Sequence, residues 1–127
     1  MRKGLKYTKT HEWADFADDL VTVGITDYAQ DMLKDVVYVE LPEVGREARV
    51  GESLVVLESV KAVSDLYAPV DGAVSAVNEA LLDQPELLNE DPYGTWVVKI
   101  KVKAGGAAPD LLEEGDYAAL VKEEADQ

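Results

Sequence analysis

The stretch that decides the fold is Val56-Leu57-Glu58-Ser59-Val60-Lys61-Ala62-Val63-Ser64-Asp65-Leu66-Tyr67-Ala68-Pro69. Two apolar, β-prone runs approach Lys61 from either side, so the stretch predicts two strands with the lysine at the turn between them. Lys61 is also the only basic residue between Val50 and Val98. A lone amine at such a turn is exposed and held in a fixed direction, which makes it easy for another enzyme to single out. It is therefore a candidate attachment point for a prosthetic group.

The rest of the chain continues this alternation of short strands and turns. Apolar runs predict strands over residues 20–25, 36–41, 50–57, 62–68, 73–77 and 95–102. Pro69 to Gly72 predicts a tight turn, with Gly72 free to take a positive φ. Residues 26–33 change to helical periodicity and predict a short helix capped by Thr26 or Asp27. Strands spaced about eight to twelve residues apart are typical of a small sandwich or barrel.

The C-terminal end changes to a helical pattern. Asp116 predicts the N-cap of a final helix, and Gly115 is expected to separate two short helical pieces. A chain of 127 residues fits one hydrophobic core. We therefore expect a single domain over residues 1–127 with a C-terminal helical extension at about 109–125.

Composition excludes several classes of function. The chain has no cysteine and one histidine, which removes disulfides and thiolate chemistry and argues against a metal site or a Ser-His-Asp triad. A net charge of −14 argues against binding nucleic acid and favours partners with basic docking faces. No apolar run has membrane-spanning length, and the N-terminus resembles neither a secretory signal nor a transit peptide. These features predict a monomeric cytoplasmic protein, with a bacterial source favoured.

The chemistry of Lys61 leaves two alternatives open. A Schiff-base enzyme needs a lysine whose pKa is depressed by burial or a nearby cation. Glu58 and Asp65 would instead hold the proton on the amine, so an enzymatic role is disfavoured. The residues themselves leave a modified lysine and an ordinary surface lysine as the choices.

The hairpin and four further segments together resemble the glycine cleavage system H-protein family. The hairpin match consists of Glu58 to Ala62, followed by Ser64-Asp65, Tyr67-Ala68-Pro69 and Gly72. The other segments occur in the same order as in the family and are Tyr7-Thr8 with His11-Glu12-Trp13, Val23 to Gln30, Val37 to Gly45, and Pro85 to Gly94. A lysine hairpin alone is a weak motif, whereas five ordered segments covering roughly Tyr7 to Lys103 are specific.

The resemblance implies a fold and a carrier function. The fold is mainly β with small helices: the barrel-sandwich hybrid of lipoyl and biotinyl domains, with a short helix after the second strand and a C-terminal helix. Lipoate would be amide-linked to Lys61 and would accept the aminomethyl group from a pyridoxal-phosphate glycine decarboxylase. It would present that group to a tetrahydrofolate-dependent aminomethyltransferase and be reoxidised by dihydrolipoamide dehydrogenase. The chain would be a carrier that catalyses no step, and a lipoate-attaching enzyme would be a fourth partner.

The resemblance also assigns supporting residues. Glu12 and Asp65 match acidic residues that line a cleft for the loaded arm, where a carboxylate would pair with the cationic amine. The lipoate-attaching enzyme would recognise the hairpin residues beside the lysine, which are Glu58, Ser59, Val60 and Ala62. Alternatively, these residues would only shape the turn. The chain departs from the family at Met32, where many members have a polar residue, and at Lys34, where glycine is common.

Three related carriers remain as alternatives. A biotin carboxyl carrier typically has methionines beside its lysine, whereas this chain has Val60 and Ala62. The lipoyl domain of a 2-oxo-acid dehydrogenase usually has an aspartate before the lysine and is part of a larger chain. An H-like protein that relays lipoate to other enzymes would have the same sequence features.

Overall fold

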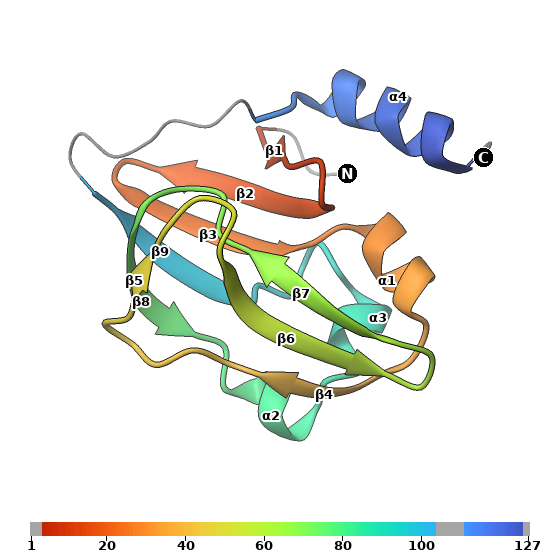
Figure 1. Ribbon diagram of the computed structural model, residues 1–127, viewed down its shortest axis with the longest axis horizontal. Coiled ribbons are helices and arrows are strands. Elements are labelled where there is room, and N and C mark those ends of the chain that lie inside the picture. Colours follow the sequence, from red (N-terminus) through yellow and green to blue (C-terminus); the bar gives the residue numbers. More distant parts are fainter. Residues whose placement is uncertain (1–3, 104–110, 126–127) are drawn as a thin grey trace.

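The computed structural model describes residues 4–103 and 111–125, which form two antiparallel sheets and four helices (Figure 1). The six-stranded sheet has the order β1 (Lys6–Tyr7), β2 (Glu12–Ala17), β3 (Leu20–Ile25), β9 (Val98–Val102), β8 (Gly72–Val77) and β5 (Glu47–Ala48). The three-stranded sheet has the order β4 (Val36–Glu40), β6 (Ser53–Ser59) and β7 (Val63–Tyr67). The helices are α1 (Asp27–Leu33), α2 (Ala80–Asp83), α3 (Leu87–Glu90) and α4 (Glu114–Ala125). This arrangement confirms the prediction of a mainly-β sandwich with small helices.

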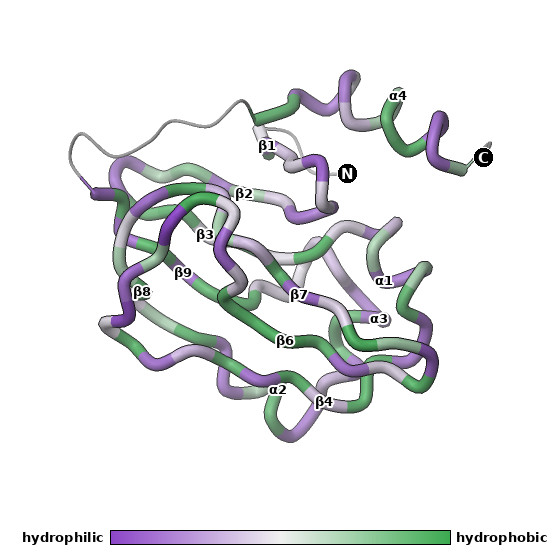
Figure 2. The backbone as a smooth tube through the Cα atoms, in the orientation of Figure 1, coloured by the Kyte–Doolittle hydropathy of each residue, from purple (hydrophilic) through white to green (hydrophobic). Residues whose placement is uncertain are grey.

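The main core lies between the two sheets. Strands such as β3 and β9 alternate buried and more exposed side chains, because successive residues of a strand point to opposite faces. Val23 and Ile100 from the large sheet and Leu57 and Leu66 from the small sheet belong to this core, and β6 is a largely apolar segment in Figure 2. Full burial of each such side chain contributes about 1.5–3 kcal/mol. The core therefore holds β6 and β7 firmly beneath their shared turn.

A second apolar cluster holds α4 against β1 and β2. It contains Leu5, Tyr7, Trp13 and Tyr117, and the rings of Tyr7 and Tyr117 stack with centroids 4.7 Å apart. In Figure 1, α4 lies over β1 along one edge of the large sheet. No helix in the described part of the chain combines the length and apolar content needed to cross a membrane.

The prediction of two helical pieces at the C-terminus is wrong. α4 is continuous from Glu114 to Ala125, with Gly115 inside it and Asp116 in its first turn rather than at the N-cap. A glycine inside a helix costs only about 1 kcal/mol, and burial of Tyr117 against the sheet outweighs that cost. Residues 109–110 of the predicted extension lie outside the described residues.

Gly72 is required for a reason other than the one predicted. Its φ lies outside the left-handed region, and it is the first residue of β8, paired with Val102. A Cβ at this position would lie 2.1 Å from the carbonyl oxygen of Lys101. Glycine therefore allows two backbones to approach closely, while the turn before it forms without a positive φ at this residue.

α1 begins and ends with well-defined caps. The hydroxyl of Thr26 accepts a hydrogen bond from the N–H of Ala29 at 3.2 Å, which confirms Thr26 as one of the two predicted caps. The helix ends where Lys34 takes φ 65° and ψ −147° and donates its N–H to the carbonyl of Gln30 at 2.9 Å. This conformation is one that only glycine adopts without strain.

We expect Lys34→Gly to raise the free energy of unfolding by about 1 kcal/mol, because it relieves backbone strain that exceeds the added entropy of the unfolded glycine. The ion pair lost with the lysine, 3.7 Å from Asp31, is exposed and contributes little. Urea unfolding monitored by circular dichroism measures the change. Lys34→Ala is the control, since alanine keeps the strain, and equal stability of the two variants would contradict the prediction.

Candidate functional site: the hairpin tip and the cleft beside it

Lys61 lies at the turn of the β6–β7 hairpin, as the sequence predicts. Glu58 pairs with Val63 at the end of the ladder, and the N–H of Ser59 donates to the carbonyl of Ala62 at 2.8 Å. Lys61 is exposed. In Figure 1 the turn between β6 and β7 projects at one end of the sandwich. Lys61 is therefore an exposed residue at a turn between two strands that contribute Leu57 and Leu66 to the core.

Side-chain and backbone hydrogen bonds make the tip rigid. The hydroxyl of Ser59 accepts from the N–H groups of Lys61 at 3.2 Å and Ala62 at 3.0 Å, and it donates to the carbonyl of Ala62 at 3.1 Å. These three bonds use the full capacity of the hydroxyl. The N–H of Val60 donates to the carbonyl of Asp35 at 3.0 Å, which ties the tip to the loop before β4. Ser59 therefore shapes the turn.

The other hairpin candidates differ in their exposure. Val60 is 68% exposed and Ala62 is exposed, whereas Glu58 is half-buried within the β6 ladder between Tyr38 and Val63. Val60 and Ala62 thus offer apolar surface beside the lysine to an incoming protein. The structure brings all four candidates to the tip, and of the four only Val60 and Ala62 are exposed.

A cleft of about 260 Å³ lies beside the hairpin and brings the two acidic candidates together. It extends from Ala62 and Val63 near the tip to Glu12 and Asp65. Apolar side chains from β3, α1 and β6 form most of its walls: Ile25, Ala29, Met32, Leu33 and Leu57. The Asp65 carboxylate accepts a hydrogen bond from the hydroxyl of Ser53 at 2.7 Å. The cleft therefore joins the surroundings of Lys61 to a pair of carboxylates by an apolar path.

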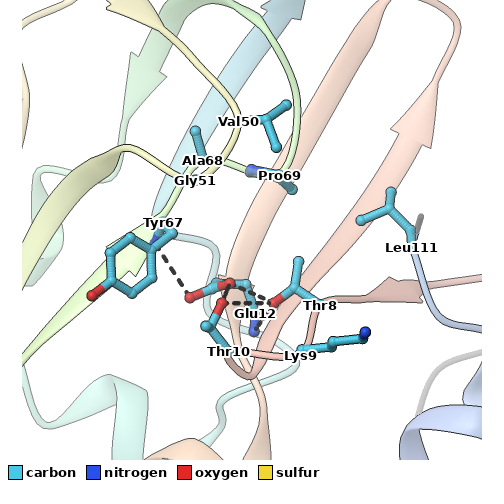
Figure 3. Close-up of a pocket in the computed structure, with 10 residues that line it drawn as sticks. All are labelled: Thr8, Lys9, Thr10, Glu12, Val50, Gly51, Tyr67, Ala68, Pro69 and Leu111. Carbon is cyan, nitrogen blue, oxygen red and sulfur yellow. Dashed lines mark hydrogen bonds between the residues drawn. The ribbon is translucent and has the colours of Figure 1, made fainter. Parts of the chain in front are cut away.

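Glu12 has a buried carboxylate that accepts hydrogen bonds from three residues outside β2. It is 1% exposed. Its Oε1 accepts from the hydroxyls of Thr8 and Thr10, the latter at 2.5 Å, and its Oε2 accepts from the N–H of Tyr67 at 3.2 Å (Figure 3). Burial raises the pKa of Glu12 above its ordinary value, while the threonine and backbone hydrogen bonds and the nearby His11 oppose that rise.

Glu12 also lines a second cavity, on the side of the hairpin away from the tip. This cavity of about 420 Å³ lies between the turn before β2 and the segment around Pro69, as Figure 3 shows. Its walls include Tyr67, Ala68 and Pro69. The carboxylate is thus part of the boundary of both cavities, fixed in place by the threonine hydroxyls and the edge of β7.

Several residues around the cleft are missing from the sequence prediction. Thr8 and Thr10 hold Glu12, His11 lines the cleft, and the backbone of Tyr67 reaches Glu12 across 55 positions. Thr8 and Thr10 belong to the turn between β1 and β2, so no strand periodicity in the sequence reveals that their hydroxyls meet Glu12. Within residues 4–103 and 111–125, no group of three or more acidic or histidine side chains is placed to hold a metal ion.

The sandwich with a single exposed lysine on a hairpin tip and an apolar cleft beside it defines a swinging-arm carrier domain of the lipoyl and biotinyl type. The glycine cleavage H-protein family model matches residues 5–124. The chain belongs to this family, as the resemblance of the five ordered segments predicted.

Relatives and a solved structure agree with this assignment. The chain is 56% identical over 120 residues to a glycine cleavage system H protein of Thermus thermophilus, covering 94% of each chain. It is 52% identical over 123 residues to a probable glycine cleavage system H protein of Aeropyrum pernix, covering 96% of this chain and 86% of the relative. The crystal structure of a glycine cleavage system H protein from Mycobacterium marinum matches with a TM-score of 0.86 and 40% identity, covering 94% of this chain and 97% of that one. These matches confirm the barrel-sandwich fold.

Proposed function

We propose that this chain carries lipoate on the Nζ of Lys61 and holds the loaded arm in the cleft that ends at Glu12 and Asp65. The chain is a lipoyl-carrying shuttle protein of the glycine cleavage system, because it belongs to the H-protein family. The observation that carries the assignment to Lys61 is the exposure of this lysine on a rigid turn beside an apolar cleft. Family membership favours this function over a biotin carrier, a 2-oxo-acid dehydrogenase domain or a lipoate relay.

The residues of the cleft fit a lipoyl arm and its cargo. When bound, lipoate supplies a dithiolane disulfide that takes up a one-carbon amine. Ile25, Leu33 and Leu57 offer apolar contact to an aliphatic chain. Glu12 and Asp65 offer carboxylate oxygens to a cationic amine at its end, where a charge-assisted hydrogen bond is strongest. Burial of the amine in this cleft would also exclude water from it.

We propose that the chain acts without catalytic residues of its own and serves four enzymes. These are a pyridoxal-phosphate glycine decarboxylase, a tetrahydrofolate-dependent aminomethyltransferase, dihydrolipoamide dehydrogenase and a lipoate-attaching enzyme. The net charge of −14 supports partners with basic docking faces. We also propose that residues 1–127 form one carrier domain; the cytoplasmic location, bacterial source and monomeric state stay predictions.

The proposed attachment is tested by intact mass spectrometry of protein made in a host that lipoylates proteins. We expect one lipoyl increment, and peptide mapping should place it on Lys61. Incubation of this protein with the decarboxylase, its cofactor and glycine should then add the mass of one aminomethyl group. A biotin increment, or a lipoyl group on another residue, would overturn the proposal.

A further inference from the structure

One hydroxyl on the C-terminal helix connects the two walls of the cleft. Tyr117 of α4 is 2% exposed, and its hydroxyl lies 2.8 Å from Nδ1 of His11 and 2.6 Å from the hydroxyl of Thr26. These partners are 106 and 91 positions away in the sequence. Tyr117 is not among the residues that line the arm cleft, so any influence on the cleft passes through His11 and Thr26.

The two partners belong to different walls of the cleft, which adjoin where Glu12 pairs with Ile25 in the β2–β3 ladder. His11 lines the cleft and directly precedes Glu12, at the turn that enters β2. Thr26 caps α1, which contributes Ala29, Met32 and Leu33 to the other wall. The N–H of Thr26 also donates to the carbonyl of His11 at 3.1 Å. The Tyr117 hydroxyl therefore adds a side-chain bridge to a backbone contact between the walls.

The donors and acceptors around this bridge form one consistent chain. Thr26 accepts from the N–H of Ala29, so its own hydroxyl proton is free to be donated to the oxygen of Tyr117. With this direction, the Tyr117 hydroxyl would donate to Nδ1 of His11, and an Nε2–H of His11 would donate to the Glu124 carboxylate, which lies 2.8 Å away. In one assignment that satisfies every member, His11 is the Nε2–H tautomer; the distances between the heavy atoms are the same whichever atom donates.

Packing fixes the bridging hydroxyl in place. The Tyr117 ring stacks on the Tyr7 ring with an interplanar angle of 10°. The His11 and Tyr117 rings form an edge contact with their centroids 5.7 Å apart. Burial raises the pKa of Tyr117, so the hydroxyl keeps the proton that it donates. His11 itself has a φ of 72°, a conformation that requires support from its surroundings. A rigid ring on α4 thus holds a strained residue next to Glu12.

We propose that Tyr117 is a positioning residue whose hydroxyl sets the spacing between the Glu12 wall and the α1 wall of the arm cleft. This inference rests on the proposed function, in which the cleft receives the loaded arm. It assigns a role to α4, an element outside the cleft. The C-terminal helix then contributes to retention of the cargo as well as to the second apolar cluster.

The first test uses the protein without its arm and compares Tyr117→Phe with Tyr28→Phe. Both variants keep their rings, and Tyr28 also contacts His11, with centroids 4.7 Å apart, without taking part in the bridge. We expect amide hydrogen exchange of Thr26 and Ala29 to become roughly fivefold faster in Tyr117→Phe, the effect of losing about one hydrogen bond. Exchange should be unchanged in Tyr28→Phe, which leaves the Tyr117 hydroxyl in place. It should also be unchanged in Thr26→Ser, because serine keeps a hydroxyl at position 26. Unchanged exchange in Tyr117→Phe would overturn the inference, regardless of the rate at which the loaded arm releases ammonia.

The second test measures ammonia release from the loaded, lipoylated protein. Tyr117→Phe should speed release roughly fivefold, and it should add nothing in a Glu12→Ala background, because the two substitutions disturb one cleft. Faster release in Glu12→Ala but not in Tyr117→Phe would overturn the positioning role while leaving the cleft function intact. Unchanged release in both variants would overturn the cleft function itself, and the inference with it. Urea unfolding of each variant verifies that the fold is retained.

Discussion

Lys61→Arg is expected to abolish lipoylation completely while leaving the fold intact. An arginine keeps the length and positive charge of the side chain, but its guanidinium stays protonated and does not replace an amine as the site of amide formation. The turn itself is held by the backbone of residues 59–62 and the hydroxyl of Ser59, and these groups remain in the variant. The loss of modification therefore reports on attachment chemistry rather than on unfolding.

Intact mass and circular dichroism on the same samples check this expectation. Lys34→Arg is the matched control, because Lys34 is exposed and lies next to Asp35, whose carbonyl binds the hairpin tip. The control should carry one lipoyl group per chain. A lipoyl increment on Lys61→Arg, or its loss in Lys34→Arg, would show that attachment depends on another amine.

The hairpin and most strands are predictable from the sequence because their signals are local. Apolar, β-prone runs on both sides of Lys61 predict β6, β7 and the turn, and the structure confirms them. The capping of α1 by Thr26 is local in the same way. The resemblance of five ordered segments adds the family and the acidic pair in the cleft.

What the sequence does not predict depends on contacts between distant segments. Gly72 is needed because of the backbone of Lys101 on a neighbouring strand, which no local turn signal reveals. Gly115 fails to interrupt α4 because Tyr117, two residues later, is buried against β1. The bridge from Tyr117 to His11 and Thr26 joins residues 106 and 91 positions apart. The partners of such side-chain hydrogen bonds are brought together only by the packed fold, so they cannot be identified from local sequence.

The protonation state of Glu12 that favours folding is not the one that favours cargo retention. Because burial raises its pKa in the folded protein above the ordinary 4.5, the folded state binds this proton more tightly than the unfolded state. The contribution of Glu12 to stability is therefore greatest below pH 4.5 and is lost as pH rises through the raised value. A cationic amine needs the ionised form, so the site gives up some stability at neutral pH to keep a charge in the cleft.

Glu12→Ala is expected to speed ammonia release from the loaded arm roughly 10- to 100-fold at neutral pH, the effect of losing a charge-assisted hydrogen bond of about 1.5–3 kcal/mol. Glu12→Gln is the control that keeps the size and polarity of the side chain but not its charge, and it should also release faster than the parent. For both variants, the ratio of variant to parent rates should fall toward one as pH drops and Glu12 becomes protonated. The bound cation itself favours the ionised carboxylate, so this fall should occur at a lower pH than the titration of Glu12 in the unloaded protein. Release rates that match the parent, or a ratio that does not change with pH, would mean that the carboxylate does not contact the cargo.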